Sequence, residues 1–231
     1  MSRKSAAMHY REEKPNMQER SYSGTVKQDS GGLIGMHETA DQQAGFAEAL
    51  ITSRQNISPK RLVAPGPSAD QQAQLFRAAA SAPDHGLLAP WRFVIVPAHK
   101  RADLAEVFAL ALIDRDPGAT LEQIEAAREK AHRAPYLLLA VARLGPCEPE
   151  IPELERMVSA GAAIQNLLLS AHSLGFGSSL TSGQAMQSMR MRALFQLLHG
   201  EEAVCFITVG TVLKRKMPRL RPDAASFVSS L

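Results

Sequence analysis

Residues 80–93 read Ala80-Ser81-Ala82-Pro83-Asp84-His85-Gly86-Leu87-Leu88-Ala89-Pro90-Trp91-Arg92-Phe93, and they join a predicted helix to a predicted strand. The helix is expected to begin at Ser68, because Gln71 follows three residues later in a capping-box pattern. Proline cannot continue a helix, so the helix is expected to stop at Pro83. Pro90-Trp91 then leads into a strand over residues 93–96. This stretch therefore predicts a helix, a tight connection and a strand.

The periodicity of apolar residues predicts the other elements on either side of this stretch. Expected helices cover residues 40–52, 100–113, 121–132, 157–174 and 186–198, and expected buried strands cover 136–142 and 203–209. Residues 54–67 hold three prolines and are expected to be an extended loop. The helix over 157–174 is apolar nearly all round, which predicts burial in a core or against a second chain, and Gly175 is expected to end it. Together these patterns indicate a protein of mixed α and β structure.

Composition favours one ordinary domain with a polar tail. The chain has 231 residues, of which 45% are hydrophobic and 21% charged. Residues 1–36 are too polar to bury much apolar surface, so we expect a flexible N-terminal extension followed by a domain over 37–231. A net charge of +3 does not favour nucleic-acid binding, and we find neither a signal peptide nor an apolar run long enough to cross a membrane. Cys147 and Cys205 are too few and too far apart for a disulfide framework or a zinc site, so a cytoplasmic location is expected, with Cys205 in the core.

Searches for common catalytic motifs exclude several chemistries. The seven histidines show no HxH, HxxxH or HExxH spacing, so the sequence does not predict a metal site. There is no G-x-S-x-G nucleophile motif and no Walker A motif. The one G-x-G, Gly175-Phe176-Gly177, follows a helix rather than a strand, which excludes a Rossmann dinucleotide site. We interpret Gly175 instead as the end of a helix. The loop expected over 177–183 is rich in small and hydroxyl residues, so its backbone can approach a flat ligand.

Three separated segments, in this order and spacing, resemble the nitroreductase family of flavoproteins. They are residues 54–62, residues 80–93, and residues 159–161 taken together with 175–183. The resemblance covers about residues 45 to 225, and the Ala-Pro-Asp-His and Pro-Trp-Arg-Phe pair within 80–93 is its most specific part. It implies an α+β fold with a mixed, largely antiparallel sheet flanked by helices. It also implies a homodimer in which the long apolar helix packs against its copy and FMN lies at the interface.

The resemblance assigns the first FMN contacts to the segment after the first helix. Arg54 matches the arginine expected at the FMN phosphate, and a guanidinium suits a phosphate because it is always charged and binds bidentately. Gln55 and Asn56 depart from the commoner Arg and Ser, but both can hydrogen-bond to the polar edge of the flavin. At the basic C-terminal end, Arg219 or Arg221 is expected to be a second phosphate cation.

Other contacts are assigned to the second and third segments. Ser81, in place of an arginine of some relatives, and His85 are expected to reach the flavin of the partner subunit. The family places a segment matching Leu180, Thr181 and Ser182 beside the flavin ring. Residues 170–175 are a further candidate, for the nicotinamide.

The resemblance implies an enzyme that transfers a hydride from NAD(P)H to a nitroaromatic, a quinone or a similar small-molecule acceptor, by a ping-pong mechanism on FMN. One alternative is a flavin-binding protein with a non-redox or specialised role. A second is a small nucleic-acid-associated protein that uses the basic N-terminal tail and residues 214–221. The low net charge and the lack of aromatic residues between the basic ones disfavour that second alternative.

Overall fold

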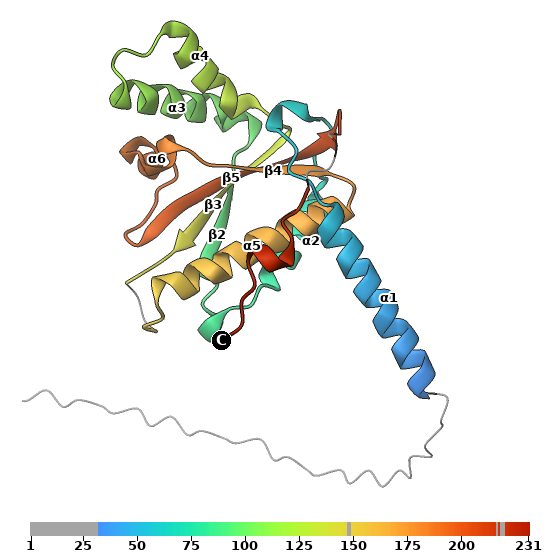
Figure 1. The fold of residues 1–231 in the computed structure, drawn as a ribbon. Helices are drawn as coiled ribbons and strands as arrows, with labels where there is room; N and C mark the ends of the chain where they lie inside the picture. Colours follow the sequence, from blue (N-terminus) through green and yellow to red (C-terminus); the bar gives the residue numbers. More distant parts are fainter. Residues whose placement is uncertain (1–31, 147–148, 216, 218–219) are drawn as a thin grey trace, which may run out of the picture. The chain divides into compact units, whose positions relative to one another are not determined.

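The computed structural model describes residues 32–146, 149–215, 217 and 220–231 (Figure 1). The chain divides into two compact units, Met1–Gln43 and Ala44–Leu231. The first unit is described from Gly32, where helix α1 (Gly32–Ser53) begins, earlier than the predicted start at residue 40. Most of the predicted extension, residues 1–31, lies outside the described residues, so the boundary at residue 36 stays a prediction. Within the described residues, no helix combines the length and apolar character needed to cross a membrane.

The second unit is an α+β fold, as expected: a five-stranded antiparallel sheet with helices on both faces (Figure 1). Its strands are β1 (Leu62–Val63), β2 (Trp91–Ile95), β3 (Tyr136–Arg143), β4 (Gly177–Thr181) and β5 (Glu201–Val212). Its helices, after the end of α1, are α2 (Ala69–Ala80), α3 (Arg101–Arg115), α4 (Leu121–Glu129), α5 (Glu153–Ser173) and α6 (Met189–Leu194). Short 3-10 turns η1 to η6 cover Pro59–Arg61, His85–Leu87, Ala98–Lys100, Lys130–His132, Gln184–Gln187 and Ala224–Ser226.

The long strand β5 is the centre of the sheet. It pairs with β1, β3 and β4, and β3 pairs in turn with β2. All of these pairings are antiparallel. A single parallel bridge joins Asn56, before β1, to Ser178 in β4. The segment that follows α1 is therefore held against the edge of the sheet.

Two apolar layers explain why β3 is a continuous run of apolar residues. Leu138 and Ala140 face a layer formed with α2 and α5, while Leu137, Leu139 and Val141 face a layer formed with α3, η5 and α6. Successive side chains of a strand point to opposite faces, so a strand covered on both faces must be apolar at every position. The predicted central strand over 136–142 is confirmed.

The capping box predicted for α2 is also confirmed. The amide of Gln71 donates to the Ser68 hydroxyl at 3.3 Å, and the amide of Ser68 donates to the Gln71 side chain at 2.9 Å. The helix ends at Ala80, just before the predicted stop. At the end of α5, Gly175 has the positive φ of 86° expected of a glycine that terminates a helix.

Three sequence-based assignments were wrong. Residues 177–181, expected to be a loop, form strand β4, because the small residues there fit closely against β5 and pair with it. The helix expected over 186–198 is shorter, because the Ser188 hydroxyl accepts from the amide of Met191 and starts a new helix after η5. The loop expected over 54–67 includes the turn η1 and the short strand β1.

Candidate functional site

The first and third family-like segments lie side by side at the edge of the sheet. The amide of Ile57 donates to the carbonyl of Ser178 at 2.9 Å. The Asn56 side-chain oxygen accepts from the amide of Leu180 at 3.2 Å. These bonds align residues 54–56 with β4, although more than a hundred residues separate them in the sequence. The structure thus places Asn56 against Leu180 in β4, with Arg54 and Gln55 in the segment just before it.

Gly177 explains how this alignment is achieved. A Cβ atom at this position would lie 2.5 Å from Val212, 2.8 Å from Leu62 and 3.1 Å from Ile57. Only a residue without a side chain allows the segment before β1 to approach β4 so closely. The glycine needed at this contact was visible in the sequence. Gly177 is the second glycine of the G-x-G motif, which does not fit a dinucleotide site.

Four basic side chains gather beside this segment, and we call them the basic cluster. Its members are Arg54, His172, Arg215 and Arg221. Arg221 donates from Nη2 to the carbonyl of Arg54 at 2.9 Å. The Nε2 atom of His172 lies 2.9 Å from the Ser53 hydroxyl. Within the described part of the chain, no carboxylate forms an ion pair with any of the four.

The electrostatics of the basic cluster favour the binding of an anion. Burial lowers the pKa of Arg54, and the nearby charge of Arg221 lowers it further. Burial, Arg215 and Arg54, in that order, lower the pKa of His172. The Nε atom of Arg54 is buried and has no hydrogen-bond partner among the described residues. A buried donor without a partner is costly, and a bound phosphate would supply both the acceptor and the negative charge.

Of these cations, sequence reasoning named Arg54 and Arg221 but not His172 or Arg215. Arg215 lies in the basic stretch that was noticed, and His172 lies within residues 170–175, which were considered for the nicotinamide instead. A lone histidine near the end of an apolar helix carries no signal of its own. Arg219 lies outside the described residues, so its role as a phosphate cation stays a prediction.

Ser81 and His85 lie elsewhere in the chain. The Ser81 hydroxyl donates to the carbonyl of Arg77 at 3.2 Å at the end of α2. The Nδ1 atom of His85 lies 2.8 Å from a carboxylate oxygen of Glu155 at the start of α5, and both side chains are largely exposed. Neither residue touches the aligned segments within one chain, so their predicted role depends on a second copy.

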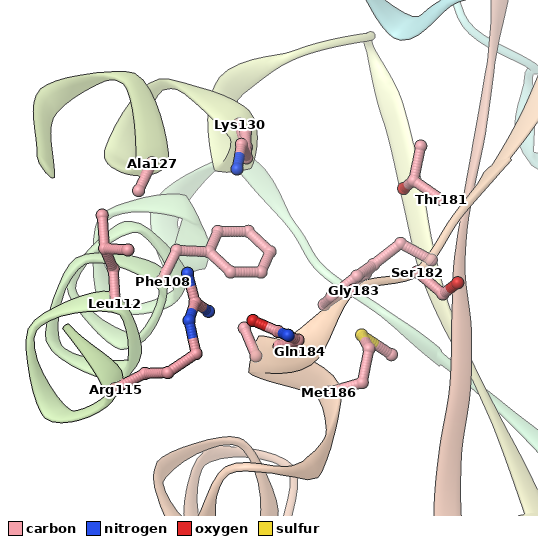
Figure 2. Close-up of a pocket in the computed structure, with 12 residues that line it drawn as sticks. Phe108, Leu112, Arg115, Ala127, Lys130, Thr181, Ser182, Gly183, Gln184 and Met186 are labelled. Atoms are coloured by element: carbon pink, nitrogen blue, oxygen red, sulfur yellow. The ribbon is translucent and has the colours of Figure 1, made fainter. Parts of the chain in front are cut away.

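A pocket of about 240 Å³ adjoins the end of β4 (Figure 2). Thr181 and Ser182 line one side of it, and α3 contributes Phe108 and Arg115 to the other. Two of the residues that the family resemblance places beside a ligand therefore open onto a cavity. No group of three or more potential metal ligands occurs among the described residues.

Comparisons with known proteins find relatives of this chain in both sequence and structure. The model of the family described as "Nitroreductase family" matches residues 56–211. A Haemophilus influenzae protein named "Putative NAD(P)H nitroreductase" is 32% identical over 186 residues, covering 80% of this chain and 99% of that protein. A nitroreductase-like family protein from Bacillus cereus has a similar fold, with a TM-score of 0.69 at 17% identity, covering 80% of this chain and 95% of the other. Iodotyrosine deiodinase, solved with FMN and 3-iodo-L-tyrosine, has a TM-score of 0.58 at 21% identity, covering 77% and 95% of the two chains.

Proposed function

This chain belongs to the nitroreductase family, and we propose that it is an FMN-dependent oxidoreductase that passes electrons from NAD(P)H to a nitroaromatic, a quinone or a similar small acceptor. The observation that carries the proposal is the buried Arg54 Nε atom, which has no partner among the described residues, in a basic cluster that no described carboxylate pairs with. The solved structure of iodotyrosine deiodinase, which holds FMN in the same fold, supports the choice of cofactor.

The basic cluster would hold the phosphate of FMN. Arg54 and Arg221 already lie together, and their mutual repulsion would be relieved by an anion of charge near −2. A guanidinium can offer two parallel donors to phosphate oxygens. His172, poised by the Ser53 hydroxyl, can donate one more hydrogen bond when protonated.

Gln55, Asn56 and the end of β4 would hold the ring system. Asn56 uses its oxygen to bind the amide of Leu180, which leaves its NH₂ group free to donate. Gln55 is half-buried and can donate likewise. Such fixed donors stabilise negative charge on a reduced flavin. When bound, FMN would supply the redox chemistry, a hydride uptake from NAD(P)H followed by reduction of an acceptor, for which we propose a ping-pong order.

We further propose a homodimer in which Ser81 and His85 reach the flavin of the second copy. Leu154 and Val158, one turn apart on α5, are 79% and 71% exposed, so this apolar stripe is open to a second copy. The connection after α2 is also strained, with positive φ at Leu87 and Ala89, and strain of this kind often accompanies binding sites. Light scattering of the purified protein measures its oligomeric state, and we expect a dimer. A monomer with fully bound FMN would refute the shared site.

The test of the phosphate assignment compares FMN with riboflavin, which lacks the phosphate. Replacing Arg54 by alanine should weaken FMN binding by about 1.5–3 kcal/mol, or roughly 10- to 150-fold, because a hydrogen bond to a charged group is lost. Riboflavin binding should stay unchanged. Arg190→Ala is the matched control, because Arg190 pairs with Asp114 on the surface. Equal weakening of both ligands, or of neither, in Arg54→Ala would contradict the assignment.

Activity is tested separately, on the flavin absorbance of the loaded protein. Anaerobic addition of NADH or NADPH should bleach the flavin bands, and a nitroaromatic or quinone should restore them. Full occupancy by FMN without bleaching would instead favour the alternative of a flavin-binding protein with a non-redox or specialised role.

A further inference from the structure

The pocket beside β4 has two walls that belong to different parts of the chain (Figure 2). Phe108 and Arg115 come from α3, and Lys130 follows α4. Opposite them are Thr181 and Ser182, two of the proposed flavin contacts, followed by the segment that includes Gln184. A ligand in this pocket would therefore touch the same residues that are proposed to lie beside the flavin ring.

The charge of the pocket is positive and unbalanced. Neither Arg115 nor Lys130 forms an ion pair or a side-chain hydrogen bond with any described residue, and no aspartate or glutamate lines the pocket. Other basic residues close to them in the sequence do form ion pairs. Arg128 pairs with Glu106 and Glu125, Arg133 pairs with Glu129, and Lys100 pairs with Asp103. Arg115 and Lys130, which face the pocket, thus have no carboxylate partner among the described residues, whereas neighbouring basic residues do.

The remaining surface of the pocket is apolar and partly aromatic. The Phe108 and Phe206 rings meet edge to face at 5.5 Å between centroids, and both line the cavity. Aromatic rings prefer offset or edge-on partners of this kind, so a further ring is favourable here. The volume of about 240 Å³ lies below the roughly 300–1,000 Å³ of sites for drug-sized ligands. A compound with one ring fits this size.

We propose that this pocket binds single-ring aromatic anions, and that the electron acceptor is of this class, with its acidic group between Arg115 and Lys130. The statement about the acceptor rests on the proposed function, whereas the statement about binding does not. Because both cations are exposed, each should contribute modestly, and together they should favour an anion about tenfold over a neutral analogue.

Equilibrium dialysis of the full chain loaded with FMN, without NAD(P)H, tests the binding itself. The probes are 4-nitrobenzoate and 4-nitrobenzamide, which differ in charge but hardly in shape. We expect about tenfold tighter binding of 4-nitrobenzoate, and loss of this preference in the Arg115→Gln, Lys130→Gln double variant. Arg128→Gln is the matched control, because Arg128 carries the same charge nearby but is already paired. Equal affinity for the two probes, or a preference that survives in the double variant, would overturn the inference.

Steady-state kinetics with the same two probes tests the acceptor. The double variant should raise the KM for 4-nitrobenzoate about tenfold and leave the KM for 4-nitrobenzamide unchanged. A change confined to the KM for NADH or NADPH would overturn the assignment to the acceptor. Turnover with no charge preference would overturn the inference and leave the proposed function standing. If the protein takes up no FMN, the proposed function fails, and dialysis of the flavin-free protein then decides the binding statement independently.

Discussion

Glu201, at the start of β5, is a buried carboxylate whose removal should be costly. Its side chain is 5% exposed and accepts two hydrogen bonds from Arg92, each of 2.8 Å. The amide of Leu198 donates to it at 3.0 Å, and Arg143 lies 3.4 Å away. These contacts, led by the bonds from Arg92, lower the pKa of Glu201 from its ordinary 4.5 to about 2. A lowered pKa means that the folded state stabilises the ionised form.

The magnitude follows from the difference between the folded and unfolded pKa values. A fall from 4.5 to about 2 corresponds to about 3 kcal/mol of stability at pH 7. Because the folded pKa is the lower one, this stability is fully present above about pH 4.5 and is lost as the pH falls towards 2. Near pH 3 about 40% of it should remain. Glu201→Gln keeps the shape of the side chain but leaves Arg92 partly buried without an anion, so a loss of about 3 kcal/mol at pH 7 is expected.

Urea denaturation of the wild type and of Glu201→Gln at pH 7 and pH 3, at one protein concentration, measures the effect. The difference in unfolding free energy should shrink by about 2 kcal/mol between the two pH values, since the wild type loses its advantage as Glu201 becomes protonated. Glu202→Gln is the control, because Glu202 forms an exposed ion pair with Arg192 that is worth about 0–1 kcal/mol. A large difference that does not depend on pH would show that packing, and not charge, explains the loss.

Two further predictions concern the sheet. Gly177→Ala should lower the unfolding free energy by about 1–3 kcal/mol and weaken FMN binding, because the new methyl group meets Val212 and Leu62. Gly45→Ala, where nothing lies within 4 Å, is the control, and equal effects of the two variants would refute the close-contact argument. Burial raises the pKa of Cys205 to about 11, so this thiol should label slowly at pH 8 in the folded protein and rapidly in urea. Peptide mass spectrometry after alkylation measures this, and rapid labelling without urea would contradict the buried position.

The fold was predictable wherever a single segment carried its own signal. The strand over 136–142 is apolar at every position because it is covered on both faces, and that burial is visible in the sequence. The α2 cap depends on Ser68 and Gln71, which are three residues apart. In contrast, four of the five residues of β4 are small or carry a hydroxyl, and local propensity assigns such residues to a loop. It becomes a strand only because β5 pairs with it, and that partner lies about thirty residues away.

The same limit explains which parts of the candidate site were predicted. Family resemblance could name residues within its motifs, such as Arg54 and Asn56, because each motif is continuous. It did not name His172 or Arg215. His172 joins the basic cluster because the last turn of α5 contacts Ser53 at the end of α1, and Arg215 joins it from the segment after β5. Arg115 and Lys130 were missed for a related reason. A basic residue points to an anion site only when no carboxylate pairs with it. The pairing cannot be read from the sequence, because partners such as Arg128 and Glu106 are 22 residues apart. The candidate anion-binding residues of this protein are therefore identified by the carboxylate partners they lack among the described residues, and only the tertiary structure gives those partners.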